Sequence, residues 1–132
     1  MRKLSLVVLL SLLNAASAEQ SYLVDWDAVG REAIDHLVEL VKIPSVNPPG
    51  NETAVAEYVR AVLVAEGIDS KLYALDPTRA NLVARHEGHG SEPPILILGH
   101  TVVVGVQPEK GAADPCSGIR EDGYVVGRGP RD

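Results

Sequence analysis

ILILGH, residues 95–100, is the segment with the strongest strand signal in this chain. Ile95 to Leu98 is an uninterrupted aliphatic run, which is typical of a short strand covered on both faces. Gly99 then lets the backbone turn closely. The sequence therefore predicts a buried central strand that delivers His100 to a loop at its carboxyl end, where open α/β sheets build their sites. Asp132, the last residue, follows a second glycine-bordered strand and is the matching candidate.

Two amphipathic helices are predicted before any strand. The first begins near Asp25 or Asp27, either of which is a suitable N-cap, and ends at Pro44. The segment IPSVNPPGNE follows, and its three prolines and one glycine predict a structured loop. The second helix runs from about Glu52 to Glu66. Its signals are Asn51 as N-cap and Gly67 placed to end it in the left-handed conformation.

Further strands are predicted on either side of the aliphatic run. They cover Ile68 to Leu75, Asn81 to His86, and Tyr124 to Arg128, the last entered through an Asp122-Gly123 turn. Val102 to Val104 is interpreted as a continuation of the central strand. Two helices followed by strands, one of them fully apolar, predict an α/β or α+β sandwich in which helices cover a mixed sheet.

The first 18 residues have the pattern of a secretory signal. Arg2 and Lys3 supply a positive start, Leu4 to Leu13 form an apolar run, and Ala16-Ser17-Ala18 fits a cleavage site. A run of this length is too short to span a bilayer. We therefore expect export to the periplasm or the exterior, no membrane attachment after cleavage, and one domain over residues 19–132.

Composition limits the partners of this domain. The 132-residue chain carries a formal net charge of −6 at pH 7, and loss of the signal makes it more negative. This balance argues against nucleic acid, which requires clustered positive charge. Cys116 is the one cysteine, so no internal disulfide is expected. No sequence feature specifies an oligomeric state.

Three sets of residues compete as a chemical site. His86 and His89 lie in a glycine-rich loop, where histidines are more often solvated than bound to metal. Cys116 has no supporting spacing to a histidine for nucleophilic catalysis. His100 with Asp132 is favoured, because both would lie at strand ends bordered by glycines, but spacing alone leaves the three open.

A series of motifs adds a resemblance to a known family. The chain resembles the amino-terminal part of the metal-dependent acetylornithine deacetylase, succinyl-diaminopimelate desuccinylase and carboxypeptidase family, to which aminoacylases also belong. The motifs, in order, are IPSVNPPGNE, NLVAR, ILILGH with VV, GVQPEK, DP-x-SG, DGY and GRG-x-x-D. They cover nearly all of residues 19–132.

The resemblance implies a fold, a cofactor and a reaction. The fold is the amino-terminal portion of a mixed-sheet α/β metallopeptidase catalytic domain with flanking helices, here incomplete. The cofactor is a pair of zinc ions, of which His100 ligates one and Asp132 bridges both. The reaction is hydrolysis of an amide bond next to a free carboxylate, with a small peptide or N-acyl amino acid as substrate.

The chain also departs from the family pattern. Val102 stands where the family has an aspartate that supports the imidazole, and loss of such a partner typically lowers metal affinity or activity by about 10–100-fold. Gly111 and Cys116 replace aromatic residues, and Pro130 replaces a small one. The family's general-base glutamate and remaining ligands come after the position of Asp132. We therefore expect a truncated, inactive fragment with weak metal binding or none.

A function from another class is the alternative. In it, the chain is a non-catalytic exported module that retains part of the fold as a binding or interaction surface. An ordered chain, or a stable partner complex formed without metal, would distinguish this alternative from the fragment of an enzyme.

Overall fold

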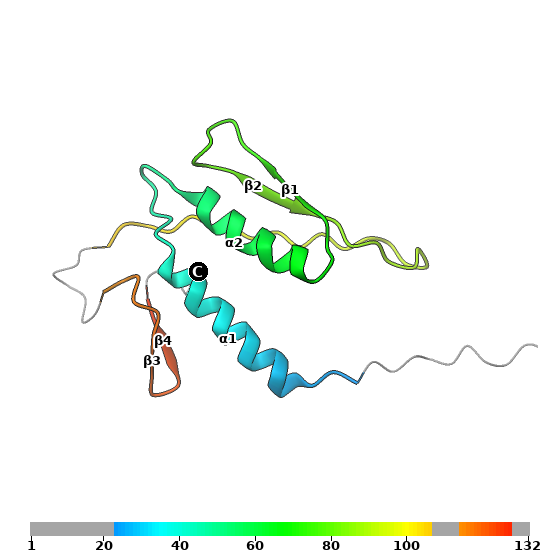
Figure 1. The fold of residues 1–132 in the computed structure, drawn as a ribbon, viewed down its shortest axis with the longest axis horizontal. Coiled ribbons are helices and arrows are strands. Elements are labelled where there is room, and N and C mark those ends of the chain that lie inside the picture. The colour runs from blue at the N-terminus through cyan, green and yellow to red at the C-terminus, as the bar shows by residue number, and fades with distance from the viewer. Residues whose placement is uncertain (1–22, 107–113, 128–132) are drawn as a thin grey trace, which may run out of the picture.

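The computed structural model describes residues 23–106 and 114–127. These residues form two helices and two separate two-stranded antiparallel sheets (Figure 1). The elements are α1 (Trp26–Lys42), α2 (Glu52–Ala65), β1 (Ser70–Tyr73), β2 (Asn81–Ala84), β3 (Ile119–Glu121) and β4 (Tyr124–Val126). Within the described ranges, no helix combines the length and apolarity needed to cross a membrane. The predicted signal over residues 1–18 lies outside those ranges.

Helix α1 forms where its caps predict it. The Asp25 side chain accepts a 3.0 Å hydrogen bond from the backbone N–H of Ala28, which satisfies one of the unpaired donors of the first turn. The helix ends at Lys42, because Ile43 is already extended before Pro44. The predicted N-cap and end are therefore confirmed.

Helix α2 begins at Glu52, as predicted, and ends at Ala65, one residue before the predicted end, but its N-terminus is capped differently. The Asn51 side chain makes no capping hydrogen bond, so that part of the prediction is wrong. The turn before β2 supplies an acceptor instead, since the Thr53 N–H at the start of the helix donates to the Thr78 carbonyl at 3.1 Å. At the other end Gly67 has a φ of 74°, the left-handed conformation that its position predicts.

The hairpin β1–β2 packs against α2 (Figure 1). The two strands pair antiparallel, from Ser70 opposite Ala84 to Tyr73 opposite Asn81. Among the described residues, few apolar side chains are strongly buried, and they come from both helices and from the residue before β2. They are Val38, Val55, Ala56 and Ala80. A core this small has little apolar area with which to stabilise the domain.

The second hairpin, β3–β4, lies beside α1 (Figure 1). Asp122 and Gly123 have φ values of 49° and 82°, the pair of positive angles that defines a type I′ turn. The predicted turn and the strand after it are confirmed, the strand as far as Val126. Its partner, Ile119–Glu121, was not predicted.

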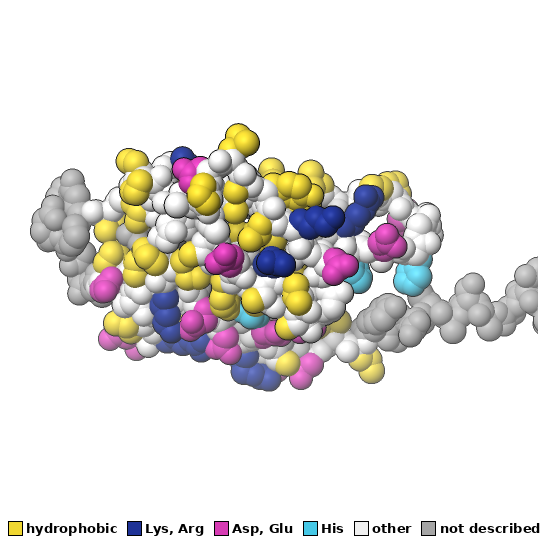
Figure 2. Space-filling model, turned by 45° about the horizontal axis from the view of Figure 1, so that its top comes forward, with side chains coloured by type: hydrophobic (Ala, Val, Ile, Leu, Met, Phe, Trp, Pro, Cys, Tyr) yellow, Lys and Arg dark blue, Asp and Glu magenta, His cyan; other side chains and the backbone are white. Residues whose placement is uncertain are grey.

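Ile95 to Leu98 does not form the predicted buried strand. No hydrogen-bonded strand is present there, and the four side chains are 87–91% exposed. An aliphatic run becomes a central strand when neighbours pair with both of its edges, and the described residues supply none for it. Figure 2 likewise shows hydrophobic side chains spread over much of the visible face. The single mixed sheet of the catalytic-domain assignment remains a prediction.

Candidate functional site around His100

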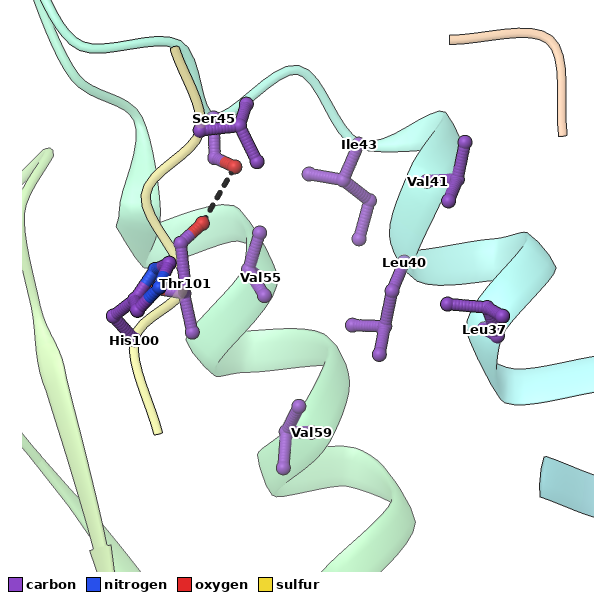
Figure 3. A pocket seen from close by; sticks show the side chains of 10 residues that line it. Leu37, Leu40, Val41, Ile43, Ser45, Val55, Val59, His100 and Thr101 are labelled. Atoms are coloured by element: carbon purple, nitrogen blue, oxygen red, sulfur yellow. Dashed lines mark hydrogen bonds between the residues drawn. The ribbon is translucent and has the colours of Figure 1, made fainter. Parts of the chain in front are cut away.

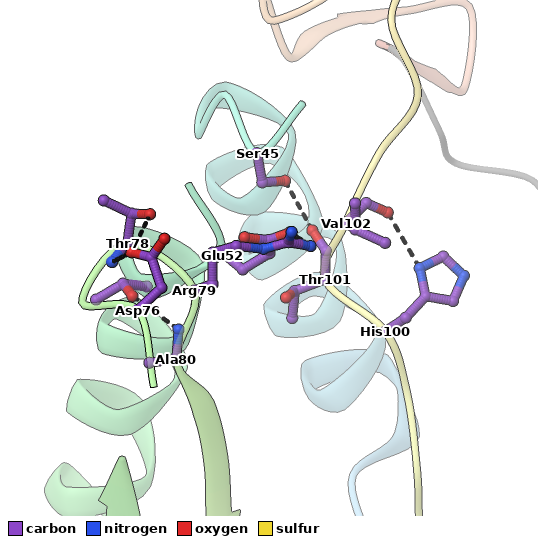
Figure 4. Close-up of polar contacts among 10 residues, drawn as sticks. Ser45, Glu52, Asp76, Thr78, Arg79, Ala80, His100, Thr101 and Val102 are labelled. Atoms are coloured by element: carbon purple, nitrogen blue, oxygen red, sulfur yellow. Dashed lines mark hydrogen bonds and ion pairs between the residues drawn. The ribbon is translucent and has the colours of Figure 1, made fainter. Parts of the chain in front are cut away.

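His100 follows the exposed aliphatic segment and is itself exposed, so it does not lie at the end of a buried strand as predicted. Its Nδ1 lies 3.1 Å from the backbone oxygen of Val102 (Figure 4). A carbonyl oxygen can only accept a hydrogen bond, so Nδ1 carries the proton in this contact. In the neutral imidazole, Nε2 then holds the lone pair, which is the form in which histidine ligates a metal.

The residues after His100 are fastened to the loop between the helices. Val103 and Val46 form an isolated parallel β-bridge. The continuation of the central strand predicted for Val102 to Val104 is therefore reduced to this one pair of residues. In it the Val103 N–H donates to the Ser45 carbonyl at 3.1 Å, and the Asn47 N–H donates to the Val103 carbonyl at 3.0 Å. The Ser45 hydroxyl adds a 2.7 Å bond to the carbonyl of Thr101 (Figure 3).

Two cavities meet at this segment. One, of about 260 Å³, lies between the helices and is lined mainly by apolar side chains, with Ser45 and His100 at its edge (Figure 3). The other, of about 650 Å³, lies between the start of α2, β2 and residues 98–102, and Glu52 and Arg79 line it. His100 lines both cavities, so a group held at its imidazole could extend into either.

An ion pair ties the start of α2 to the turn before β2. Arg79 Nη2 donates to Glu52 Oε1 at 3.2 Å, and the Glu52 side chain is 9% exposed (Figure 4). The second carboxylate oxygen, Oε2, is buried without a hydrogen-bond partner in the described part of the chain. A Cβ at Gly50 would lie 2.8 Å from that oxygen, so the glycine makes room for the pair.

Asp76 organises the turn that carries Arg79. Its Oδ1 accepts hydrogen bonds from the Thr78 N–H at 2.8 Å and from the Thr78 hydroxyl at 2.7 Å (Figure 4). These two bonds, followed by the nearby Arg79 charge, lower the pKa of the Asp76 carboxyl. The turn is therefore stabilised by the ionised carboxylate.

The other candidate residues do not gather around His100. His86 and His89 are exposed in the loop after β2, and Cys116 is partly buried, its N–H bonded to Asp114. Asp132 lies outside the described residues, as do the departures at residues 111 and 130.

The described residues around His100 do not provide a complete set of metal ligands. Within residues 23–106 and 114–127, no three His, Cys, Asp or Glu side chains are grouped as metal ligands. A zinc site uses three or four protein ligands. His100, with Nδ1 on a carbonyl, fits one such ligand, and the described residues do not complete the set.

Two elements of this arrangement were missed by reasoning from the sequence. The sequence predicts Ser45 only as part of a structured loop, whereas its hydroxyl donates a hydrogen bond to the backbone next to His100. The Val102 carbonyl has no signature in the sequence, because every residue carries a backbone carbonyl. The presence of IPSVNPPGNE and ILILGH in one motif series was the available signal that the two segments belong together.

Comparison with known proteins gives matches over most of the chain. It is 36% identical over 104 residues to the probable succinyl-diaminopimelate desuccinylases of two Staphylococcus epidermidis strains, ATCC 35984 and ATCC 12228. The match covers 77% of this chain and 24% of each relative, so the chain spans about a quarter of their length. No protein-family model matches, and no solved structure matches. The similarity supports a family of the succinyl-diaminopimelate desuccinylase kind.

Proposed function

We propose that this chain is part of an amide hydrolase of the desuccinylase kind, exported and dependent on zinc. The observation that carries the proposal is the 36% identity over 104 residues to the two desuccinylases. The substrate class we propose is an N-succinyl or other N-acyl amino acid, or a small peptide, with a free carboxylate beside the amide bond. The metallopeptidase-like catalytic domain over residues 19–132 is part of this proposal.

His100 and Asp132 are the proposed metal ligands in this chain. Zinc, when bound, would polarise the amide carbonyl and a water molecule. The chain's own contribution is to hold the His100 imidazole with Nδ1 bonded to the Val102 carbonyl, which leaves the lone pair of the neutral ring on Nε2. Two ligands are fewer than a stable zinc site requires, so we expect the chain alone to bind zinc weakly and to be inactive.

The test uses both the chain and a relative. In a chimera, the matching segment of the Staphylococcus desuccinylase is replaced by the 104 residues of this chain. We expect the chimera to release succinate from N-succinyl-diaminopimelate in the presence of zinc, and His100→Ala to abolish that release.

The matched control for His100→Ala is His89→Ala, which removes an exposed loop imidazole. A folded chimera without activity, or one in which the two substitutions have equal effects, would contradict the proposal. Separately, the 132-residue chain is incubated with zinc or cobalt and the same substrate. Turnover that depends on His100 would overturn the expectation that this chain is inactive alone.

A further inference from the structure

We propose that Ser45 is a positioning residue for His100. It acts through the backbone of residues 101–103, which it holds so that the Val102 carbonyl stays against Nδ1 and fixes the tautomer with Nε2 unprotonated. The inference rests on the proposed function in one respect, namely that Nε2 is used to bind a metal.

The first step is the hydrogen bond at the imidazole. Nδ1 lies 3.1 Å from the Val102 oxygen, and that oxygen has no proton to donate. Metal-binding histidines almost always donate their second ring N–H to a carboxylate, a backbone carbonyl or water, which fixes the tautomer and the direction of the ring. In this chain the acceptor is a backbone carbonyl, that of Val102.

The second step is what keeps that carbonyl in place. The residues on both sides of Val102 are held by Ser45: its hydroxyl donates to the Thr101 carbonyl at 2.7 Å, and its carbonyl accepts the Val103 N–H at 3.1 Å. Ser45 is 2% exposed, so water competes little for these bonds. The Val103 N–H belongs to the same peptide as the Val102 carbonyl, and the Thr101 carbonyl belongs to the preceding peptide, so the two bonds together limit rotation of the Val102 carbonyl.

The third step concerns the departure at position 102. The family resemblance places an aspartate there, and a valine side chain cannot accept a hydrogen bond from the imidazole. The main-chain oxygen of the same residue makes that bond in this structure. In this chain the imidazole is therefore supported by the backbone instead of a side chain, so its orientation depends on how firmly Ser45 holds that backbone.

The test measures the tautomer of His100 directly. The ¹⁵N-labelled 132-residue chain is studied by NMR without metal under mildly alkaline conditions, at the pH where the ¹⁵N shifts show the ring to be neutral. We expect His100 to carry its proton mainly on Nδ1. A majority of the Nε2–H tautomer in the unsubstituted chain would overturn the proposal, whatever the variants show.

Two variants separate positioning from general stability. In Ser45→Ala we expect the ratio of Nδ1–H to Nε2–H to fall by about 2–10-fold, as for the loss of one neutral hydrogen bond, with faster amide exchange at Val103. The control, Thr53→Val, also removes a 2.7 Å hydroxyl-to-carbonyl bond, to Pro77, together with the 2.9 Å bond that the Ala80 N–H donates to the same hydroxyl. Both bonds lie away from His100, so we expect the ratio to stay unchanged. Equal shifts in both variants, or none in Ser45→Ala, would overturn the proposal.

Folding of the variants is checked by their helical circular dichroism. If Ser45→Ala unfolds, Ser45→Thr replaces it: the retained hydroxyl should keep the Nδ1–H tautomer, and its loss in a folded Ser45→Thr chain counts against the proposal. Zinc titration and desuccinylase activity are measured separately. An expected tautomer with no zinc binding and an inactive chimera would reject the proposed function and leave the positioning role standing.

Discussion

Arg79 and Glu52 form an ion pair of unequal exposure, with Nη2 and Oε1 3.2 Å apart. The Arg79 side chain is 45% exposed, whereas that of Glu52 is 9% exposed. The carboxylate has therefore lost most of its hydration, and the guanidinium supplies the opposite charge that compensates for it. This pair joins the first turn of α2 to the turn that leads into β2.

Removal of Arg79 should destabilise the chain more than removal of an exposed cation. Arg79→Met leaves the Glu52 carboxylate buried without its partner, and we expect a loss of about 1–3 kcal/mol in the free energy of unfolding. Lys42→Met is the control, because the Lys42–Glu39 pair is half exposed on both sides and should contribute at most about 0.5 kcal/mol. Urea unfolding measures both.

A second substitution checks the cause of that loss. Adding Glu52→Gln to Arg79→Met removes the buried charge and should restore part of the stability. Equal losses in Arg79→Met and Lys42→Met would show that the carboxylate is better hydrated than the structure indicates.

Gly50 should tolerate a methyl group poorly. It has a φ of 99°, and a Cβ there would approach Glu52 Oε2 to 2.8 Å and Arg79 Nε to 3.1 Å. We expect Gly50→Ala to reduce stability by about 1–3 kcal/mol. Gly30→Ala, inside α1 with nothing within 4 Å of the new Cβ, should instead add about 0.5–1 kcal/mol. Thermal unfolding of the two variants should therefore move in opposite directions.

The contribution of Asp76 should depend on pH. Its pKa is lowered from the ordinary 3.8 by the hydrogen bonds from Thr78, so the folded state favours the ionised carboxylate. The contribution is fully present above pH 3.8 and is lost as the pH falls through the lowered pKa. Asp76→Ala should be less stable than the unsubstituted chain at pH 6, with the difference shrinking in acid. A difference that grows on acidification would contradict this sign.

The aliphatic segment should tolerate polar substitutions. Because Leu96 and Ile97 are 87% and 91% exposed, Leu96→Ser with Ile97→Thr should change the free energy of unfolding by less than about 0.5 kcal/mol. The same residues in a buried strand would cost about 2–5 kcal/mol each when truncated. Urea unfolding distinguishes the two cases, with Val55→Ser, a substitution at a side chain that is 5% exposed, as the destabilising control.

Local signals predicted local structure well. The helices begin and end where capping residues and Pro44 place them, and the Asp122-Gly123 turn forms because both residues accept positive φ. Such features depend on a few neighbouring residues. Asn51 is the exception. Its side chain suits an N-cap, but the hydrogen bond at the helix start is made by the backbone of the turn before β2.

Features that depend on distant partners were not predictable in the same way. The apolarity of Ile95 to Leu98 indicates that burial is favourable, but it does not specify which strands provide it. His100 follows that segment in the sequence, but its role as a metal ligand stays a prediction, and no spacing rule relates it to Ser45. Asp132, the second predicted ligand, lies outside the described residues and stays a prediction.

The Ser45–Thr101 hydrogen bond joins residues 56 positions apart, and between them lie α2 and the hairpin β1–β2. Closing so long a loop costs chain entropy before any contact compensates for it, whereas a helix and an adjacent hairpin form from near neighbours. We therefore expect the segment bearing His100 to be the last part to settle during folding and the first to detach from the native state. The orientation of the His100 imidazole would then show whether the chain has finished folding, independently of any catalytic activity.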